Sequence, residues 1–311
     1  MRWLLAALVA FAGGGCGGDD GGSGGGRVDG GGNPECEAEA GSMPASGAVK
    51  LGGVTTIDDT RASLEGLLVS GTDWQFFNMA PQRQVESARA GDCVLYQWEP
   101  AFCEPACTDG ICHDGECKSY PDLLSAGTLR VVAGSQFIEA DAGSPTFWGQ
   151  IYLEEILAAP MAGVEVAFCA GGEAAGGFGA ILESVPPLLG ALPDDGILEL
   201  TDGDDMVVSW DADSDARVRL TLNADNEAHG LPYRAILECD AADTGQLVIP
   251  QELVEAFPAV PRPSEPVVCA GSDCPRSQLI RYRAHQVDEP DLKVEVRVES
   301  AVEFWIEHQG V

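Results

Sequence analysis

The residues best able to do chemistry in this sequence are its cysteines, and four of them lie close together. Cys103, Cys107, Cys112 and Cys117 fall in the run CEPACTDGICHDGEC, with the spacing C-x3-C-x4-C-x4-C and Asp-Gly turns between them. Two disulfides would stabilise so short a segment chiefly by restricting its unfolded ensemble. The alternative is a metal site of thiolates and the nearby histidine, but zinc sites usually contain closer cysteine pairs. We therefore expect a disulfide-bonded knuckle.

A second candidate site is acidic. Asp211, Asp213 and Asp215 alternate along the run DADSD, and oxygen ligands at alternate loop positions suit Ca²⁺, which takes about six to eight of them. The EF-hand pattern that begins at Asp211 fails at its sixth and twelfth positions, where Ala216 and Leu222 replace glycine and glutamate. A calcium loop of another kind is one interpretation, and a solvated turn in an acidic protein is the other.

The motifs of common catalytic sites are absent from the sequence. Outside the glycine-rich tract at 17–34 there is no G-x-S-x-G, and the chain has no H-E-x-x-H and no Gly-Lys-Ser/Thr. The four histidines are scattered, which favours ordinary structural positions. A hydrolase with two carboxylates across a cleft is an alternative, because a sequence does not show the separation of two acids. We expect a protein without enzymatic activity.

The first sixteen residues indicate export. A short positive segment is followed by an apolar run at 3–12 (WLLAALVAFA) and by three glycines before Cys16. The apolar run is too short to span a bilayer as a helix, so residues 1–15 are predicted to be a signal peptide. The small residues that end at Cys16 resemble a bacterial lipobox, although Gly13 stands where Leu or Val is usual. The resemblance implies cleavage before Cys16 and lipidation of its thiol, and an ordinary signal peptide cut elsewhere is the alternative.

Residues 16–34 are interpreted as a lipidated cysteine followed by a tether. The tract at 17–34 contains ten glycines, and such a tract behaves as a flexible coil. Acyl chains on Cys16 would hold the protein on a membrane surface. Gly17 stands where inner-membrane retention usually goes with aspartate, so the resemblance implies an outer membrane lipoprotein on the periplasmic or cell-surface face.

The other cysteines have the count that complete pairing requires. Of the 11 cysteines, lipidation of Cys16 would leave ten, and an even number in an exported chain favours a full set of disulfides. Cys269 and Cys274, in CAGSDC, are expected to close a small loop together. The sequence does not decide the pairing of the remaining four, which are Cys36, Cys93, Cys169 and Cys239.

The composition excludes some classes of partner. The chain has 50 Asp and Glu residues against 17 Lys and Arg residues, and its formal net charge is -33. Nucleic acid is not an expected partner, because binding to phosphates needs a basic surface. With 45% hydrophobic residues, the chain can bury a core and is not expected to be disordered as a whole. Solubility or docking to a basic partner would explain the acidic balance.

Apolar residues at alternate positions predict β-strands through most of the body. The clearest runs lie at 129–133, 164–168, 206–210, 217–222, 247–249 and 292–299. Less regular candidate strands lie at 67–69, 74–77 and 93–98, and the run at 149–159 is ambiguous between helix and strand. The best helix signal is the segment 250–257, which begins with one proline and is followed by another.

These patterns predict a mainly β fold with two β-sandwich-like domains. Turn signals separate the strand runs of 191–311 at spacings typical of β-sandwiches, so this part is interpreted as an immunoglobulin-like or fibronectin-like sandwich. Residues 35–190 are predicted to form a first β-rich domain that carries the knuckle at 103–117 as a small disulfide-rich insertion. A single long unit with several sheets is the alternative.

The whole pattern resembles cysteine-rich exported lipoproteins of the myxobacterial type. The resemblance rests on the lipobox, the tether and the cysteine spacing at 103–117, and on the later run SWDADSDARVRLTLN at 209–223. It implies an envelope location and β-rich domains, and it supplies no catalytic residue and no ligand. The leading hypothesis is therefore a non-enzymatic, lipid-anchored envelope protein that binds a protein or glycan partner. A carboxylate-based carbohydrate-active hydrolase and a purely structural envelope component are the alternatives, and Ca²⁺ is the one cofactor considered.

Overall fold

The computed structural model describes most of the chain from residue 47 onward. The described residues are 47–56, 62–66, 84–99, 103–108, 110–113, 115–119, 124–133, 136–141, 152–156, 162–172, 177–188, 191, 193, 195–213, 215–224, 233–262, 277–289 and 292–309. Only the backbone is described for 47–56, 62–66, 111, 113, 136–137, 152–156, 288–289 and 292–293. The candidate strands at 67–69 and 74–77 lie outside the described residues, as do Cys16, Cys36, Cys269 and Cys274.

The fold is mainly β, which confirms the predicted fold class. The strands are β1 (Gly47–Thr56), β2 (Ala62–Gly66), β3 (Gln84–Ala90), β4 (Cys93–Trp98), β5 (Ile111–His113), β6 (Glu116–Lys118), β7 (Leu129–Ala133), β8 (Gln136–Ala140), β9 (Tyr152–Ile156), β10 (Glu165–Ala170), β11 (Phe178–Glu183), β12 (Ile197–Leu200), β13 (Met206–Ser209), β14 (Arg217–Ala224), β15 (Ala235–Ala242), β16 (Gln246–Ile249), β17 (Ser277–Glu289) and β18 (Leu292–His308). The helix is α2 (Gln251–Ala256). The ambiguous run at 149–159 contains the strand β9, and the predicted helix at 250–257 is confirmed by α2.

One large sheet organises the molecule. It has ten strands in the order β3-β4-β15-β14-β17-β18-β1-β2-β9, with β12 also paired to β18. The longest strand, β18, pairs in parallel with β1 along its first part and with β12 along its last part, while β17 lies antiparallel on its other side. Strands from both predicted domains are therefore hydrogen-bonded into the same sheet, and the domain boundaries themselves stay a prediction.

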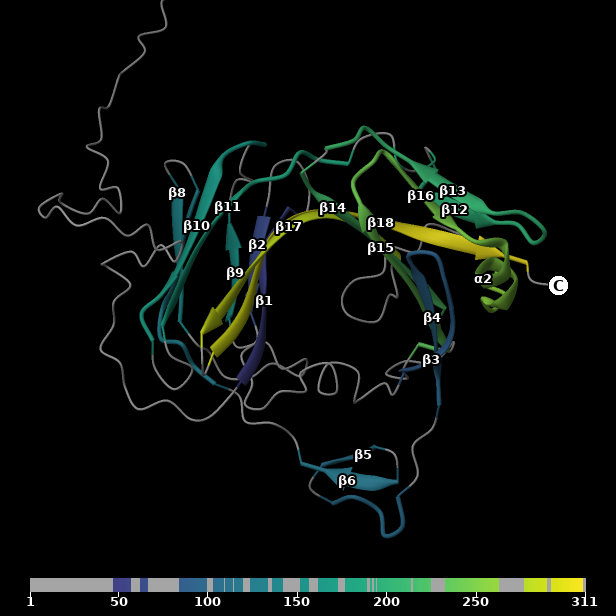
Figure 1. Cartoon of the computed structure of the whole chain (residues 1–311), viewed down its shortest axis with the longest axis horizontal. Helices are drawn as coiled ribbons and strands as arrows, with labels where there is room; N and C mark the ends of the chain where they lie inside the picture. The colour runs from purple at the N-terminus through teal and green to yellow at the C-terminus, as the bar shows by residue number, and fades with distance from the viewer. Residues whose placement is uncertain are drawn as a thin grey trace, which may run out of the picture.

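Two layers cover one face of this sheet, and each has its own hydrophobic cluster. The smaller sheet β11-β10-β7-β8 packs on the even-numbered valines of β18, from Val294 to Val298. The two-stranded sheet β13-β16 and α2 pack on β4, β14 and β15 and on the end of β18, where Phe304 and Ile306 lie. Because alternate residues of a strand point to opposite faces, both clusters lie on the same side of β18. Figure 1 shows the large sheet curved as an arch, with the two layers on its outer side.

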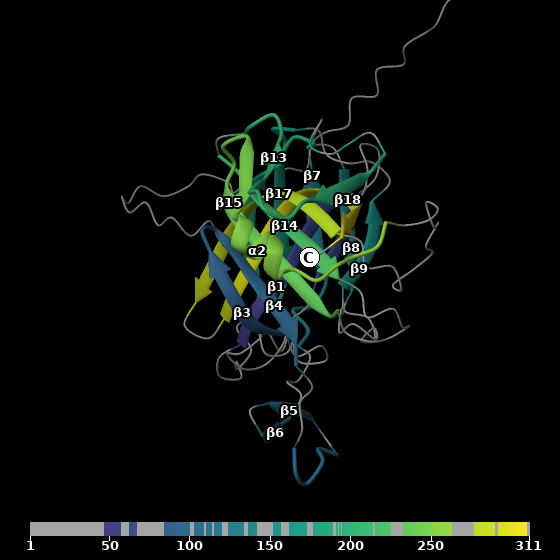
Figure 2. The same cartoon turned by 90° about the vertical axis from the view of Figure 1, so that its right-hand side faces the viewer.

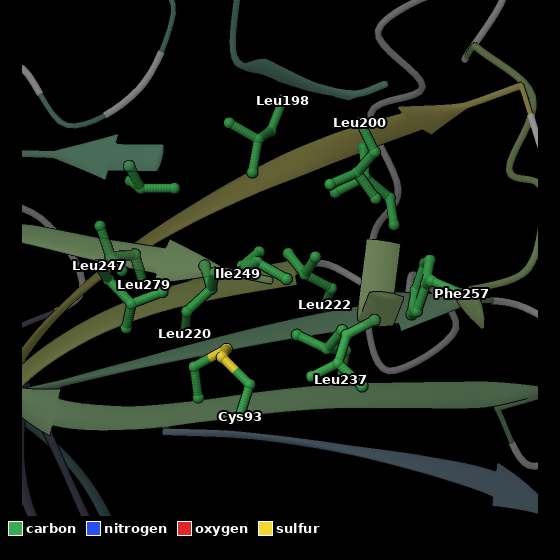
Figure 3. Packing of buried hydrophobic residues seen from close by; sticks show 14 of the residues in the cluster. Cys93, Leu198, Leu200, Leu220, Leu222, Leu237, Leu247, Ile249, Phe257 and Leu279 are labelled. Atoms are coloured by element: carbon green, nitrogen blue, oxygen red, sulfur yellow. A yellow bond between two sulfur atoms is a disulfide. The ribbon is translucent and has the colours of Figure 1, made fainter. Parts of the chain in front are cut away.

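The second cluster is closed by a disulfide and by α2 (Figure 3). Cys93 and Cys239 lie directly opposite each other on β4 and β15, both are fully buried, and they form a disulfide. Leu253 and Val254 of α2 are buried against the same cluster. Each such side chain contributes about 1.5–3 kcal/mol through burial, so α2 stabilises this part of the fold.

The knuckle is a small hairpin that stands apart from the sheets (Figures 1 and 2). β5 and β6 pair antiparallel, and the disulfides Cys103–Cys112 and Cys107–Cys117 staple the segment. The predicted disulfide-bonded knuckle is thereby confirmed. Gly110 is required by close approach, because a Cβ at this position would lie 2.1 Å from the carbonyl oxygen of Lys118.

A candidate binding surface on the open face of the sheet

The face of the ten-stranded sheet opposite the two clusters carries a group of polar side chains, here called the polar cluster. Its members are Arg217, Arg219, Asp240, Tyr282 and Arg297. Strand register brings them together, because Arg219 lies opposite Asp240 on β15 and Arg217 lies opposite Tyr282 on β17. Odd-numbered residues of β14 point away from the core that Val218, Leu220 and Leu222 enter. The cluster therefore lies on the inner side of the arch.

Asp240 collects the hydrogen bonds of the polar cluster. Its Oδ1 accepts from Nε of Arg217 at 2.8 Å, and its Oδ2 accepts from Nε and Nη2 of Arg219 at 2.8 and 2.6 Å. The hydroxyl of Tyr282 donates to the same Oδ2 at 2.7 Å. Charge-assisted hydrogen bonds of this kind are about twice as strong as neutral ones, so the carboxylate is held in one orientation.

Two guanidinium groups pack on the ring of Tyr282. The Cζ atom of Arg219 lies 5.4 Å from the ring centroid and that of Arg297 lies 4.8 Å away. Both distances are within the range of a cation–π interaction. Tyr282 is only 5% exposed, whereas the side chain of Arg217 is 52% exposed. The cluster thus has a rigid centre and one arginine available at the surface.

The charges of the polar cluster set the protonation of its members. Burial alone would raise the pKa of Asp240, but the hydrogen bonds from Tyr282, Arg219 and Arg217 lower it below its ordinary value. Burial raises the pKa of Tyr282, and its hydrogen bond to Asp240 raises it further. Burial would lower the pKa of Arg219, but Glu238 and Asp240 raise it above its ordinary value. At neutral pH the carboxylate and the guanidinium are charged, and the phenol is neutral.

The same face continues on β4 with two aromatic residues. Tyr96 lies opposite Ile236 of β15 and opposite Glu86 of β3. Trp98 is two residues further along β4, so it points to the same side of the sheet, and it is 39% exposed. Polar groups of both signs and exposed aromatic surface therefore share one face, which is a composition that binding surfaces favour.

The opposite, covered face holds a group of polar side chains around Arg281, here called the Arg281 network, which the sequence did not predict. Arg281 of β17 donates through Nε to Oδ2 of Asp243 at 2.6 Å, and through Nη1 to the carbonyl oxygens of Pro186 and Pro187 at 3.1 and 3.2 Å. It also donates to the carbonyl oxygen of Asp211. The indole of Trp210 donates to the other oxygen of Asp243 at 2.5 Å. This network ties three loops to β17 and is a structural feature of the covered face.

The predicted calcium residues lie beside the Arg281 network. Oδ2 of Asp213 is 2.9 Å from Nη2 of Arg283, so that carboxylate has a structural partner. Asp211 and Asp215 are exposed. In the described part of the chain, the three ligand-bearing side chains whose donor atoms lie within 4.8 Å of one another are Cys103, Cys107 and Cys112. Those sulfur atoms are in disulfides, so the group offers no thiolate to a metal.

The acidic run that precedes β13 also has structural partners. Asp205 accepts from the backbone N–H of Gln251 at 2.7 Å, which satisfies one of the first N–H groups of α2. Oδ1 of Asp202 is 3.1 Å from Nε2 of the buried His308. These aspartates thus hold the end of β18 and the start of α2 in place.

A polar pocket lies at the ends of β12 and β18. Its volume is about 510 Å³, and its lining includes Glu199, Asp202, Glu307 and Arg262. Nη1 of Arg262 contacts Glu199 at 2.8 Å and Glu307 at 2.9 Å. None of the described residues that line this pocket is aromatic, and Asp202 is paired with His308. We therefore place the candidate binding surface on the polar face of the sheet.

The cysteines of the described residues are all in disulfides. Besides the cysteines of the three bridges given above, Cys169 on β10 is also disulfide-bonded. The pairing of Cys36, Cys269 and Cys274 and the export of the chain stay predictions. Within the same described part, no helix is long and apolar enough to cross a membrane.

No protein family matches the sequence, and no curated protein matches it.

Proposed function

We propose that this chain is a non-enzymatic, lipid-anchored protein of a bacterial cell envelope that binds an envelope component through the polar face of its large sheet. The single observation that carries the proposal is the polar cluster, in which Asp240 and Tyr282 orient two arginines on the sheet face opposite the two hydrophobic clusters. Ordered donors and acceptors reduce the entropy that binding costs. On the covered face of the same sheet, by contrast, Arg281 is fully buried in its ion pair with Asp243.

The proposal includes the signal peptide, lipidation at Cys16 and an outer membrane location. The disulfides support an oxidising compartment, because such bonds rarely persist in the cytoplasm. The charge of -33 supports a body held away from anionic lipid head groups at the end of the tether. An immunoglobulin-like or fibronectin-like arrangement of the strands in 191–311 belongs to the same proposal.

Metabolic labelling tests the anchor. Cells that express the full chain are fed an alkyne analogue of palmitate, and the protein is compared with its Cys16→Ala variant. We expect label on the natural chain and none on the variant, because the variant has no thiol to acylate. Equal labelling of both chains would reject the anchor.

Capture by envelope fragments tests the binding surface. The full chain, kept in detergent, is incubated with envelope fragments of the expressing bacterium and sedimented. We expect Arg217→Glu to weaken capture by at least about tenfold, because it places a repulsive charge in the middle of the surface. Arg262→Glu is the matched control, since its side chain is 48% exposed against 52% for Arg217 and it lies at the pocket of β12 and β18. Equal capture of both variants would reject the polar face as the site.

A further inference from the structure

The end of the polar face on β4 presents aromatic surface in a fixed frame. Tyr96 and Trp98 are about 7 Å apart along the strand and point to the same side. Trp98 is one of the few large hydrophobic residues with more than a third of its surface exposed among the described residues, at 39%. The backbone N–H of Trp98 donates to the carbonyl oxygen of Arg234 at 3.0 Å, so its strand is pinned to β15. The indole is therefore held at the surface by an ordered backbone.

Charged groups of both signs surround Tyr96. Burial raises the pKa of Tyr96; Glu238 and Glu86 raise it further, while Arg89 and Arg219 oppose them. Nε of Arg89 donates to Oε1 of Glu86 at 3.0 Å. Because both acidic and basic groups lie near this ring, the surface offers hydrogen-bond donors and acceptors without a strong net charge.

Gln84 adds a buried polar group next to Trp98. It lies directly opposite Trp98 on β3, is 8% exposed, and donates through Nε2 to the carbonyl oxygen of Tyr233 at 2.7 Å. Its Oε1 is buried, and within the described part of the chain it has no hydrogen-bond partner. A buried acceptor without a partner costs about 1–3 kcal/mol, so it calls for an explanation. Since Oε1 is enclosed by protein, Gln84 contributes to this surface as the buried polar residue beside Trp98.

We propose that Tyr96, Trp98 and Gln84 form a subsite for a neutral glycan. A pyranose ring has an apolar face of C–H groups, which packs on the face of an aromatic ring, and hydroxyls around its edge that both donate and accept. Trp98 and Tyr96 supply the stacking surface, Glu238 and Arg219 bind hydroxyls, and Gln84 lies buried beside Trp98. This inference rests on the proposed function, since it names the ligand class for the same face.

The chemistry of the surface disfavours other ligand classes. A polyanion would meet Glu86 and Glu238, and a polycation would meet Arg89 and Arg219, so neither finds a surface of one sign. A peptide that added a strand would have to pair with the edge strand β3, but the register shifts between Glu86 and Ala88 and charged side chains line that edge. Irregularity and charge are the features by which edge strands avoid such pairing.

Isothermal titration calorimetry of the full chain in detergent tests the subsite. The probes are hexamers of β-1,4-linked N-acetylglucosamine and of β-1,4-linked glucose, with a heparin-derived hexasaccharide as the charged comparison. We expect at least one neutral hexamer to bind saturably and the charged one to bind less tightly. Trp98→Ala should weaken binding by about tenfold, because loss of the stacking surface removes the main apolar contact.

The control variant is Val248→Ala. It shortens a similarly exposed apolar side chain, 41% exposed, in the two-stranded sheet β13-β16. It should leave the affinity unchanged, and a thermal melt of each variant shows that the fold is retained. Trp98→Phe keeps a stacking ring and should retain most of the affinity.

The outcomes separate this inference from the proposed function. If neither neutral hexamer binds while envelope capture still depends on Arg217, the glycan subsite is overturned and the partner is a protein or a charged polymer. Unchanged affinity in Trp98→Ala also overturns the subsite. If no hexamer binds and capture does not depend on Arg217, the proposed function fails as well.

Discussion

Two arginine–aspartate pairs lie on opposite faces of the same sheet, and they differ in how much water reaches them. On the covered face the side chains of Arg281 and Asp243 are 1% and 0% exposed, and on the polar face those of Arg219 and Asp240 are 18% and 22% exposed. Both pairs have a short contact of 2.6 Å. The distance therefore does not distinguish them, whereas burial does.

The difference in burial indicates which ion pair stabilises the fold. A fully buried pair loses nearly all of its hydration, so removal of one partner leaves an uncompensated charge in the core. A pair whose side chains keep 18% and 22% of their surface in water can be rehydrated when one partner is lost, and it can exchange part of its contacts for those of a ligand. The covered pair therefore serves stability, and the polar pair is free to serve binding.

The largest effect is expected from loss of the covered carboxylate. Asp243→Ala should lower the free energy of unfolding by about 3–5 kcal/mol, because Arg281 would remain buried without a counter-ion. Asp240→Ala should cost only about 1–3 kcal/mol, because the arginines left behind can reach water. Urea unfolding followed by tryptophan fluorescence measures both.

The paired replacement Asp243→Ala with Arg281→Met is the control for this prediction. It removes both charges and should recover at least about half of the loss, because well-packed apolar residues often replace a buried ion pair at little cost. If Asp240→Ala costs as much as Asp243→Ala, the distinction between the two faces is wrong.

An intermediate effect is expected from the indole that shares Asp243. Trp210→Phe keeps an aromatic ring but removes the donor that lies 2.5 Å from Oδ1 of Asp243. We expect a loss of about 1–3 kcal/mol in the free energy of unfolding, since a buried acceptor is left unsatisfied. Thermal unfolding at neutral pH measures it, and an unchanged midpoint would mean that water already reaches the covered pair.

A further intermediate effect is a pH dependence that belongs to the polar face. The pKa of Asp240 is lowered in the folded state, so its contribution to stability is present above about pH 4 and is lost as the pH falls through the folded pKa. The pKa of Tyr282 is raised, so its contribution is present below about pH 10 and is lost as the pH rises. Asp240→Asn should remove the acid-side component and Tyr282→Phe the alkaline-side one. Stability curves across pH measure this, and parallel curves for all three chains would contradict it.

The smallest effect on stability is expected at the exposed arginine of the polar cluster. Arg217→Ala should change the free energy of unfolding by less than about 1 kcal/mol, because the side chain is half exposed and its ion pair is screened. Arg219→Ala should lower the free energy of unfolding more than Arg217→Ala, because the side chain of Arg219 is largely buried. A loss above about 2 kcal/mol for Arg217→Ala would make it a structural residue and weaken its assignment to binding.

Sequence patterning predicted the strands whose two faces differ most. The alternation at 217–222, 292–299 and 129–133 is confirmed by β14, β18 and β7, because each has one face in a core and one toward water. β17 was missed. It carries arginines on its covered face, at positions 281 and 283, so its sequence has no apolar and polar alternation to recognise.

The site residues depend on pairings between distant strands. Arg219 and Asp240 lie 21 positions apart, and Arg217 and Tyr282 lie 65 apart, so their neighbourhood follows from register and not from local spacing. The sequence showed that odd-numbered residues of 217–223 face away from the core, which is a real signal for this surface. It contained no signal for the partner strand. The ion pair of Asp213 with Arg283 was not predicted for the same reason, because the two residues lie far apart in the sequence.

The most direct test of the central claim is hydroxyl-radical footprinting of the full chain with and without envelope fragments, read by mass spectrometry. If the polar face is the binding surface, oxidation of Tyr96 and Trp98 falls when fragments are added. Val207 and Val248 lie opposite each other in the two-stranded sheet β13-β16 and are 53% and 41% exposed, and their oxidation rates stay unchanged. Protection of the two valines with unchanged oxidation of Tyr96 and Trp98 would contradict the account.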